Sequence, residues 1–195
     1  MAGPQLPESR ELLKLWRRFR GSKRLPDQDD VRLEELADFL PNIYVLDIES
    51  DKRFIWSYCG AQYRERFHGL DFTGRNILDV PHPFFQERLV QRIRTIFDFG
   101  YAGCTHTRLM TTDGRMKTIE NMAFPIEKRP GGVRQAYIAL YYIDGPDATA
   151  FHNPGMNDVQ IVGESFIDLG SGYAAVIDAS ELPHSVFPGL PDQTK

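Results

Sequence analysis

The sequence has few of the features that mark several large classes of protein. Its 195 residues include only two cysteines, Cys59 and Cys104, too few for a disulfide framework or a cysteine-rich zinc module. No apolar run approaches the roughly 20 residues that cross a bilayer. The first residues also lack the apolar segment of a secretory signal. These absences predict a reduced, cytoplasmic protein that has no membrane partner.

An excess of basic residues is missing as well. The 23 lysines and arginines are outnumbered by 27 aspartates and glutamates, which gives a net charge of −4, whereas nucleic-acid-binding domains are usually basic. We therefore expect no nucleic-acid partner. The charge is uneven, at +5 over residues 1–24 and −6 over residues 146–195. The two ends either attract each other, face separate partners or are simply solvated.

Motifs of the common enzyme classes are absent too. The chain contains no Gly-x-Ser-x-Gly elbow, Walker loop, His-Glu-x-x-His pair or dinucleotide-binding glycine fingerprint. We therefore expect a protein that is not an enzyme. One alternative stays open, a cone-fold (NTF2-like) lyase or isomerase in which Glu120 and His106 form an acid–base pair across two strands.

What the sequence does contain begins with an amphipathic helix over residues 8–20. Its apolar positions form one stripe, its arginines and a lysine cover the other side, and Gly21 follows as a stop signal. Too few aromatic residues flank the stripe for a membrane-surface helix, so it predicts either a helix that caps the domain or an interface between the two chains of a homodimer. The interface candidates are Leu12, Leu15, Trp16 and Phe19.

Alternating segments dominate residues 25–145 and predict an α+β domain. Two strands, 42–48 and 53–59, form a hairpin, short helices follow, and 84–99 has the apolar spacing of a long helix. Three more strands come after it, the first two joined by an Asp-Gly turn at 113–114. Sequential pairing predicts a five-stranded antiparallel sheet with short helices and one long helix on one face, plus the N-terminal helix.

The domain organisation predicted from these patterns has three parts. They are an N-terminal helical extension (1–24), the α+β domain (25–145) and an acidic tail containing proline and glycine (146–195). The tail holds one strand candidate, residues 159–169. Its role as an edge strand, as a pairing segment for a neighbour or as a mobile segment stays open.

The order of these elements, with certain short motifs, resembles a PAS domain, specifically a bacterial subfamily of small stand-alone PAS proteins. One group of motifs is the Asp-Gly hairpin 109–115, followed by Glu120 and by Phe-Pro-Ile at 124–126. The other group is Tyr-Cys-Gly at 58–60, Phe-His-Gly at 67–69 and Phe-Thr-Gly-Arg-Asn-Ile at 72–77, with Leu-Pro at 25–26 and Leu-Pro-Asn-Ile at 40–43 upstream.

The resemblance implies a sensory or regulatory module that binds a small ligand or a protein partner in bacterial signalling. A PAS-like sheet curves around its short helices and leaves an apolar hollow, which aromatic and sulfur-containing side chains would line. A solid core would use the same residues. The pocket candidates are Trp56, Tyr58, Phe67, His68, Phe72, His106, Met110, Met122, Phe124 and Tyr137.

The cofactor of such a module stays unknown from the sequence. Flavin-type PAS domains carry a reactive cysteine in a short helical motif, and residues 60–69 contain none. Haem would need an axial histidine in the hollow, for which only His68 and His106 are placed within the domain. Cys104 and His106 share one strand face, but two ligands with no third in the sequence predict no metal site.

Overall fold

The computed structural model describes residues 3–79, 83–128, 130–144, 160–170 and 176–178. Its centre is one antiparallel sheet of seven strands in the order β2-β1-β5-β4-β3-β6-β7. The strands are β1 (Ile43–Ser50), β2 (Arg53–Cys59), β3 (Tyr101–Met110), β4 (Met116–Ile126), β5 (Arg134–Tyr142), β6 (Gln160–Asp168) and β7 (Val176–Asp178). The helices are α1 (Pro7–Arg20), α2 (Leu33–Leu36), α3 (Ala61–Arg66) and α4 (Pro83–Phe99), with 3-10 turns η1 (Leu40–Asn42) and η2 (Ile77–Asp79).

The predicted PAS-like antiparallel sheet is confirmed, with one correction to its size. The five expected strands form the block β2-β1-β5-β4-β3, and β6 and β7 extend it to seven. The extra strands come from the acidic tail, because the predicted segment 159–169 pairs with β3 as β6. The sheet therefore continues beyond residue 145.

Turn chemistry sets the boundaries of these elements. Gly100 lies between α4 and β3 with a positive φ of 72°, and Gly114 has a φ of 77° in the turn between β3 and β4. Both values lie in the left-handed region that glycine adopts without steric cost. α1 begins with Pro7 in its first turn and ends before Gly21. Among the described residues, no helix is long and apolar enough to cross a membrane.

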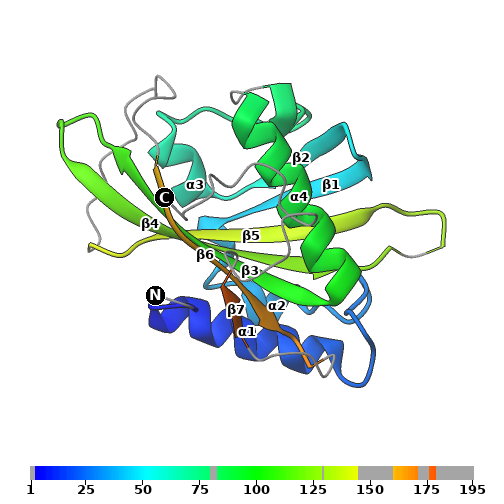
Figure 1. The fold of residues 1–195 in the computed structure, drawn as a ribbon. Coiled ribbons are helices and arrows are strands. Elements are labelled where there is room, and N and C mark those ends of the chain that lie inside the picture. The colour runs from blue at the N-terminus through cyan, green and yellow to red at the C-terminus, as the bar shows by residue number, and fades with distance from the viewer. Residues whose placement is uncertain (1–2, 80–82, 129, 145–159, 171–175, 179–195) are drawn as a thin grey trace, which may run out of the picture.

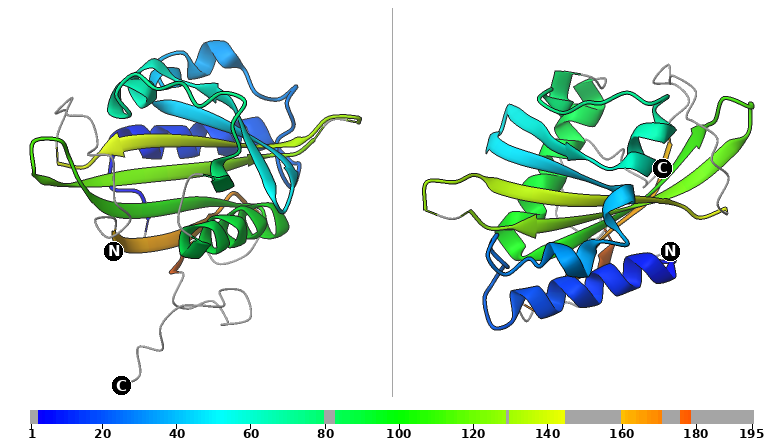
Figure 2. Two further views of the ribbon diagram at one scale, coloured as in Figure 1. Left: turned by 90° about the horizontal axis from the view of Figure 1, so that it is seen from above. Right: turned by 180° about the vertical axis from the view of Figure 1, so that it is seen from behind.

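Helices cover both faces of the sheet, as Figures 1 and 2 show. α4 lies on one face together with α3, and Gly103 of β3 lets α4 approach closely, since a Cβ there would lie 3.4 Å from Ile96. α1 lies on the opposite face. There the Trp16 indole stacks on Phe124 at 4.7 Å between ring centroids and donates a hydrogen bond of 3.2 Å to the Pro125 carbonyl.

The core therefore has two layers, one on each side of the sheet. Leu12 and Trp16 of α1 are completely buried, and Phe19 is 7 % exposed. Three of the four predicted dimer-interface residues thus pack inside their own chain, and Leu15 is partly buried against the same core. α1 caps the domain with its apolar stripe, the first of the two interpretations that the sequence left open. The homodimer stays a prediction, and it needs a surface other than these buried side chains.

Candidate functional site

A cavity of about 260 Å³ lies between the sheet and the helices α3 and α4. Its walls are mainly aromatic and aliphatic, with two hydroxyl-bearing side chains, Tyr63 and Thr107, and two guanidinium groups. The sheet curves enough that β2 and β3, which have three strands between them, both contribute to it. The lining residues are Trp56, Tyr63, Phe67, Phe72, Ile77, Arg88, Leu89, Arg92, Thr107 and Ile161.

The aromatic wall is a continuous cluster of rings. Trp56 stacks on Phe72 at 5.0 Å between centroids, and Phe67 meets Phe72 edge-on at 5.4 Å. The ring centroids of Tyr63 and Phe67 are 4.9 Å apart. Burial raises the pKa of the Tyr63 hydroxyl well above its ordinary value. Such a wall offers flat, polarisable surface of the kind that planar ligands bind.

The segment 72–76 holds this wall against the edge of the sheet. Gly74 N donates to the Trp56 carbonyl (2.8 Å), and Trp56 N donates to the Arg75 carbonyl (3.1 Å). The Asn76 side-chain oxygen accepts a hydrogen bond from Phe54 N at 3.0 Å. These contacts give a structural reason for the Phe-Thr-Gly-Arg-Asn motif, which fixes Phe72 beside the tryptophan.

The charged side of the cavity is built by α4 and β6. The Glu164 carboxylate forms ion pairs with Arg88 (Nη2 to Oε2, 2.8 Å) and with Arg92 (Nε to Oε1, 2.5 Å). The glutamate is 7 % exposed. Burial by itself raises the pKa of Glu164, but the two guanidinium groups outweigh it and hold that pKa below its ordinary value. Glu164 therefore stays ionised and fixes both arginines at the cavity.

A β-bulge in β6 explains how the tail contributes two residues to one face. Ile161 pairs with Thr107, but the next partner pair along β3 is His106 with Gly163, so Val162 is the extra residue. Val162 is 51 % exposed. Residues three apart on a regular strand face opposite sides. The extra residue puts Ile161 and Glu164 on the same face, so that Ile161 lines the cavity and Glu164 binds the arginines of α4 there.

The predicted pocket residues separate into two groups. Trp56, Phe67 and Phe72 line the cavity. His68 is exposed at the end of α3 with a φ of 57°, and Tyr58 is 38 % exposed on β2. Neither histidine that was considered for haem is among the described lining residues.

The remaining candidates do not line the cavity, and three of them, in addition to His106, pack on the face that α1 covers. Phe124 of β4 and Tyr137 of β5 contact Trp16, and the completely buried Met122 lies two residues before Phe124 on β4, on the same face. Met110 lies near the end of β3, paired with Met116. The period of two along a strand predicts that alternate residues share a face, but no signal in the sequence shows which face is hollow.

Sequence reasoning missed the arginines, Glu164 and Ile161. The apolar period of 84–99 identifies the helix but not the side on which its arginines meet the sheet. Glu164 and Ile161 fall in the tail, where the pairing partner of the strand was left open. The available signal for a buried ion pair was a glutamate between the apolar pairs Ile161-Val162 and Phe166-Ile167.

A second polar cluster lies on the α1 face of β3 and β4. His106 Nε2 is 2.8 Å from Glu120 Oε2, as expected for residues paired across these strands, and 4.0 Å from Cys104 Sγ. The cone-fold alternative requires this His–Glu pair inside a hollow. The pair lies instead under the N-terminal segment, on the face opposite Thr107 and the cavity.

Comparison with known proteins identifies the family of the chain through a family model. No curated protein matches the chain. About 60% of it superposes on 35% of the chain of an RNA-binding light-oxygen-voltage receptor, with 20% identity and a TM-score of 0.38. The chain thus spans about a third of that receptor's length. A PAS domain family model matches residues 5–139, which include α1 and the strands β1 to β4 with most of β5. The chain therefore belongs to the PAS domain family.

Proposed function

We propose that this PAS domain is a sensory module that binds a small aromatic anion in the cavity between α4 and the sheet. The observation that carries the proposal is the composition of the cavity, which combines four aromatic rings with two arginines. Ligand sites are typically apolar clefts with a few polar groups that fix orientation. A volume of about 260 Å³ suits a ligand of one or two fused rings.

The arginines favour a negatively charged ligand. Arg88 and Arg92 are 19 % and 15 % exposed at their side chains, and both bind the single carboxylate of Glu164. Among the described residues that line the cavity, these two arginines are the charged ones. A guanidinium group binds carboxylates through paired hydrogen bonds, so a ring carrying a carboxylate fits both walls.

A signal from the cavity would pass through protein contact. β6 carries the cavity residue Ile161 next to the exposed Val162, so a ligand that moves Ile161 also moves this surface position. A protein partner and a homodimer are both compatible with this route.

The test uses 1-naphthoate and its neutral analogue 1-naphthamide as probes, measured by calorimetry on the full chain. We expect saturable binding of naphthoate and at least tenfold weaker binding of naphthamide. Ile161→Trp fills the cavity and should abolish binding. The matched control is Val162→Trp at the neighbouring exposed position, which should bind as the wild type does.

Two results would overturn the proposal. One is the absence of saturable naphthoate binding to the wild-type chain. The other is equal binding to the Ile161→Trp variant, which would place any bound probe outside the cavity. Equal affinities for naphthoate and naphthamide would show that the negative charge does not contribute to binding, and the cavity would then be a site for an apolar ligand.

A further inference from the structure

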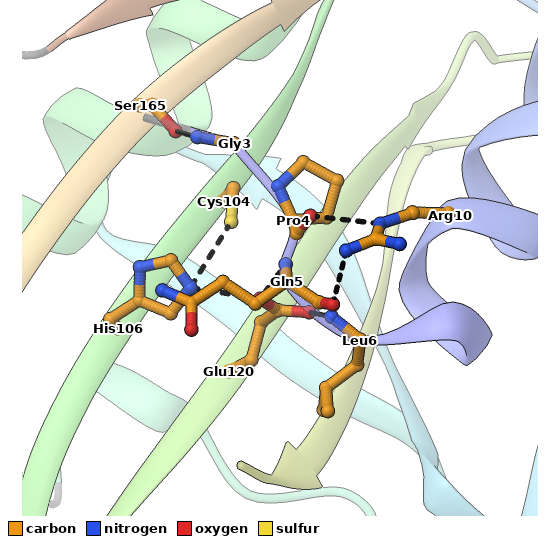
Figure 3. Close-up of polar contacts among 9 residues, drawn as sticks. All are labelled: Gly3, Pro4, Gln5, Leu6, Arg10, Cys104, His106, Glu120 and Ser165. Carbon is orange, nitrogen blue, oxygen red and sulfur yellow. Dashed lines mark hydrogen bonds and ion pairs between the residues drawn. The ribbon is translucent and has the colours of Figure 1, made fainter. Parts of the chain in front are cut away.

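Three metal-ligating side chains converge beneath the N-terminal segment, apart from the cavity. Cys104 and His106 project from β3 and Glu120 projects from β4, as Figure 3 shows. One ligand atom from each lies within 4.8 Å of the other two. All three residues are buried, with exposed fractions of 0 %, 4 % and 0 %.

The arrangement differs from a proton relay. In a Cys–His–acid relay the thiol and the carboxylate occupy different ring nitrogens, because the proton crosses the imidazole. Here Sγ and Oε2 both face the same nitrogen, Nε2, at 4.0 Å and 2.8 Å. The other nitrogen, Nδ1, packs against Gly163, where a Cβ would lie only 3.3 Å away. Sγ, Nε2 and Oε2 therefore face a common point, as the ligand atoms of a metal site do.

We propose that Cys104, His106 and Glu120 form a binding site for a divalent transition-metal ion of the zinc class. Thiolate, imidazole and carboxylate are the ligands that zinc takes in proteins. Zinc–ligand distances of about 2.0–2.3 Å in a tetrahedron separate N from O by about 3.4 Å and N from S by about 3.6 Å. The observed separations of 2.8 Å and 4.0 Å reach those values by shifts of well under 1 Å.

Charge balance supports the assignment. The cluster offers two groups that bind zinc as anions, the Cys104 sulfur and the Glu120 carboxylate, beside the imidazole of His106. A divalent cation binds the cysteine as its thiolate. The thiol proton then leaves to solvent, and the cation with one thiolate and one carboxylate is electrically neutral. A neutral set avoids the high cost of an uncompensated buried charge.

The N-terminal segment covers the site and connects it to α1. Gln5 N and Leu6 N donate to the Glu120 carboxylate at 2.6 Å and 3.3 Å, and Gly3 N donates to Ser165 Oγ at 3.1 Å. Leu6, the residue before α1, makes no side-chain cap, so Glu120 supplies the negative charge that a helix N-terminus favours. A metal on Oε2 competes with the Gln5 amide, so metal binding changes the attachment of this segment.

The test is a titration of the metal-free full chain with Co²⁺, followed by competition with Zn²⁺. We expect one Co²⁺ per chain, a thiolate-to-cobalt charge-transfer band, and loss of that band when Zn²⁺ is added. Zn²⁺ in hundredfold excess over its Kd should raise the Tm by roughly 5–10 °C. Cys104→Ser should lose the band, and the matched control Cys59→Ser, at the other buried cysteine, should keep it.

The wild-type protein alone can refute the proposal, whether or not a variant folds. Absence of the charge-transfer band in the wild-type chain, or a Tm unchanged by Zn²⁺, would overturn it. A band that persists in Cys104→Ser and disappears in Cys59→Ser would overturn it too, because it would place the metal at the other cysteine. None of these measurements involves the cavity, so the naphthoate test stands or fails independently.

Discussion

The replacement Trp16→Ala tests whether α1 belongs to the core of its own chain. Trp16 is completely buried, stacks on Phe124 and contacts Phe19 edge-on at 5.7 Å. Its indole N–H also donates to the Pro125 carbonyl. Alanine removes the ring, leaves a cavity under the helix and leaves that buried carbonyl without this donor.

The expected loss follows from these contacts. Truncation of a buried tryptophan to alanine costs about 3–5 kcal/mol, and a lost hydrogen bond adds about 1 kcal/mol. Since 1 kcal/mol shifts the Tm by about 2–4 °C at this chain length, we expect a decrease of roughly 10–20 °C. Circular dichroism during heating and urea unfolding measure both quantities. Leu15→Ala is the control, because Leu15 is only partly buried, and it should cost about 1 kcal/mol.

A different outcome would show that the helix serves a second chain. If Trp16→Ala lowered the free energy of unfolding by less than about 1 kcal/mol while light scattering showed a dimer becoming a monomer, the packing argument would be refuted. The double variant Trp16→Ser, Phe19→Ser sharpens the comparison. The interface interpretation predicts a folded monomer, whereas the structure predicts a chain that no longer folds stably.

Three further predictions concern the walls of the cavity and its supports. Gly60→Ala should destabilise the chain by about 3 kcal/mol in urea unfolding, because a Cβ there would overlap the Leu40 carbonyl oxygen; a loss below 1 kcal/mol would contradict this close approach. Glu164→Gln should cost about 3 kcal/mol at neutral pH. The lowered pKa of Glu164 contributes stability that is present above the ordinary value of 4.5 and is lost as the pH falls through the folded-state pKa. Unfolding at pH 7 and pH 3 should therefore show a smaller acid loss in the variant, and equal losses would refute the ion pair's role. Asn76→Ala should lower the Tm by a few degrees and weaken naphthoate binding, since the amide of Phe54 loses its acceptor; unchanged binding would contradict its support of the aromatic wall.

Much of the fold follows from local sequence patterns. The segments 42–48, 53–59 and 84–99 were predicted within a few residues of β1, β2 and α4, because strand alternation and helical spacing are short-range properties. The Asp-Gly turn fixed the pairing of β3 with β4. The five-stranded block was therefore predictable, and PAS family membership is confirmed.

The candidate site was less predictable because it depends on which face of each strand is hollow. Trp56 and Phe124 look alike in the sequence, since both are aromatic residues in alternating segments. One lines the cavity and the other packs under α1. The partner of β6 is a long-range property of the same kind. Without it neither Ile161 nor the ion pair of Glu164 can be placed. The pairing of His106 with Glu120 was predictable from the hairpin, but its place beneath the N-terminal segment was not, because that contact is also long-range.

β3 connects the two proposed sites because its side chains alternate between them. Thr107 lines the cavity, and its neighbour His106 lies in the cluster beneath the N-terminal segment. β6 also contacts both sites, because its bulge at Val162 places Ile161 at the cavity and Gly163 against the His106 ring. A ligand that displaces Thr107 and Ile161 therefore strains the backbone that positions His106, and the strain reaches α1 through Glu120. Because the residues on the two faces share one strand backbone, we expect occupancy of the cavity and attachment of the N-terminal segment to be thermodynamically coupled, each altering the other by the same factor.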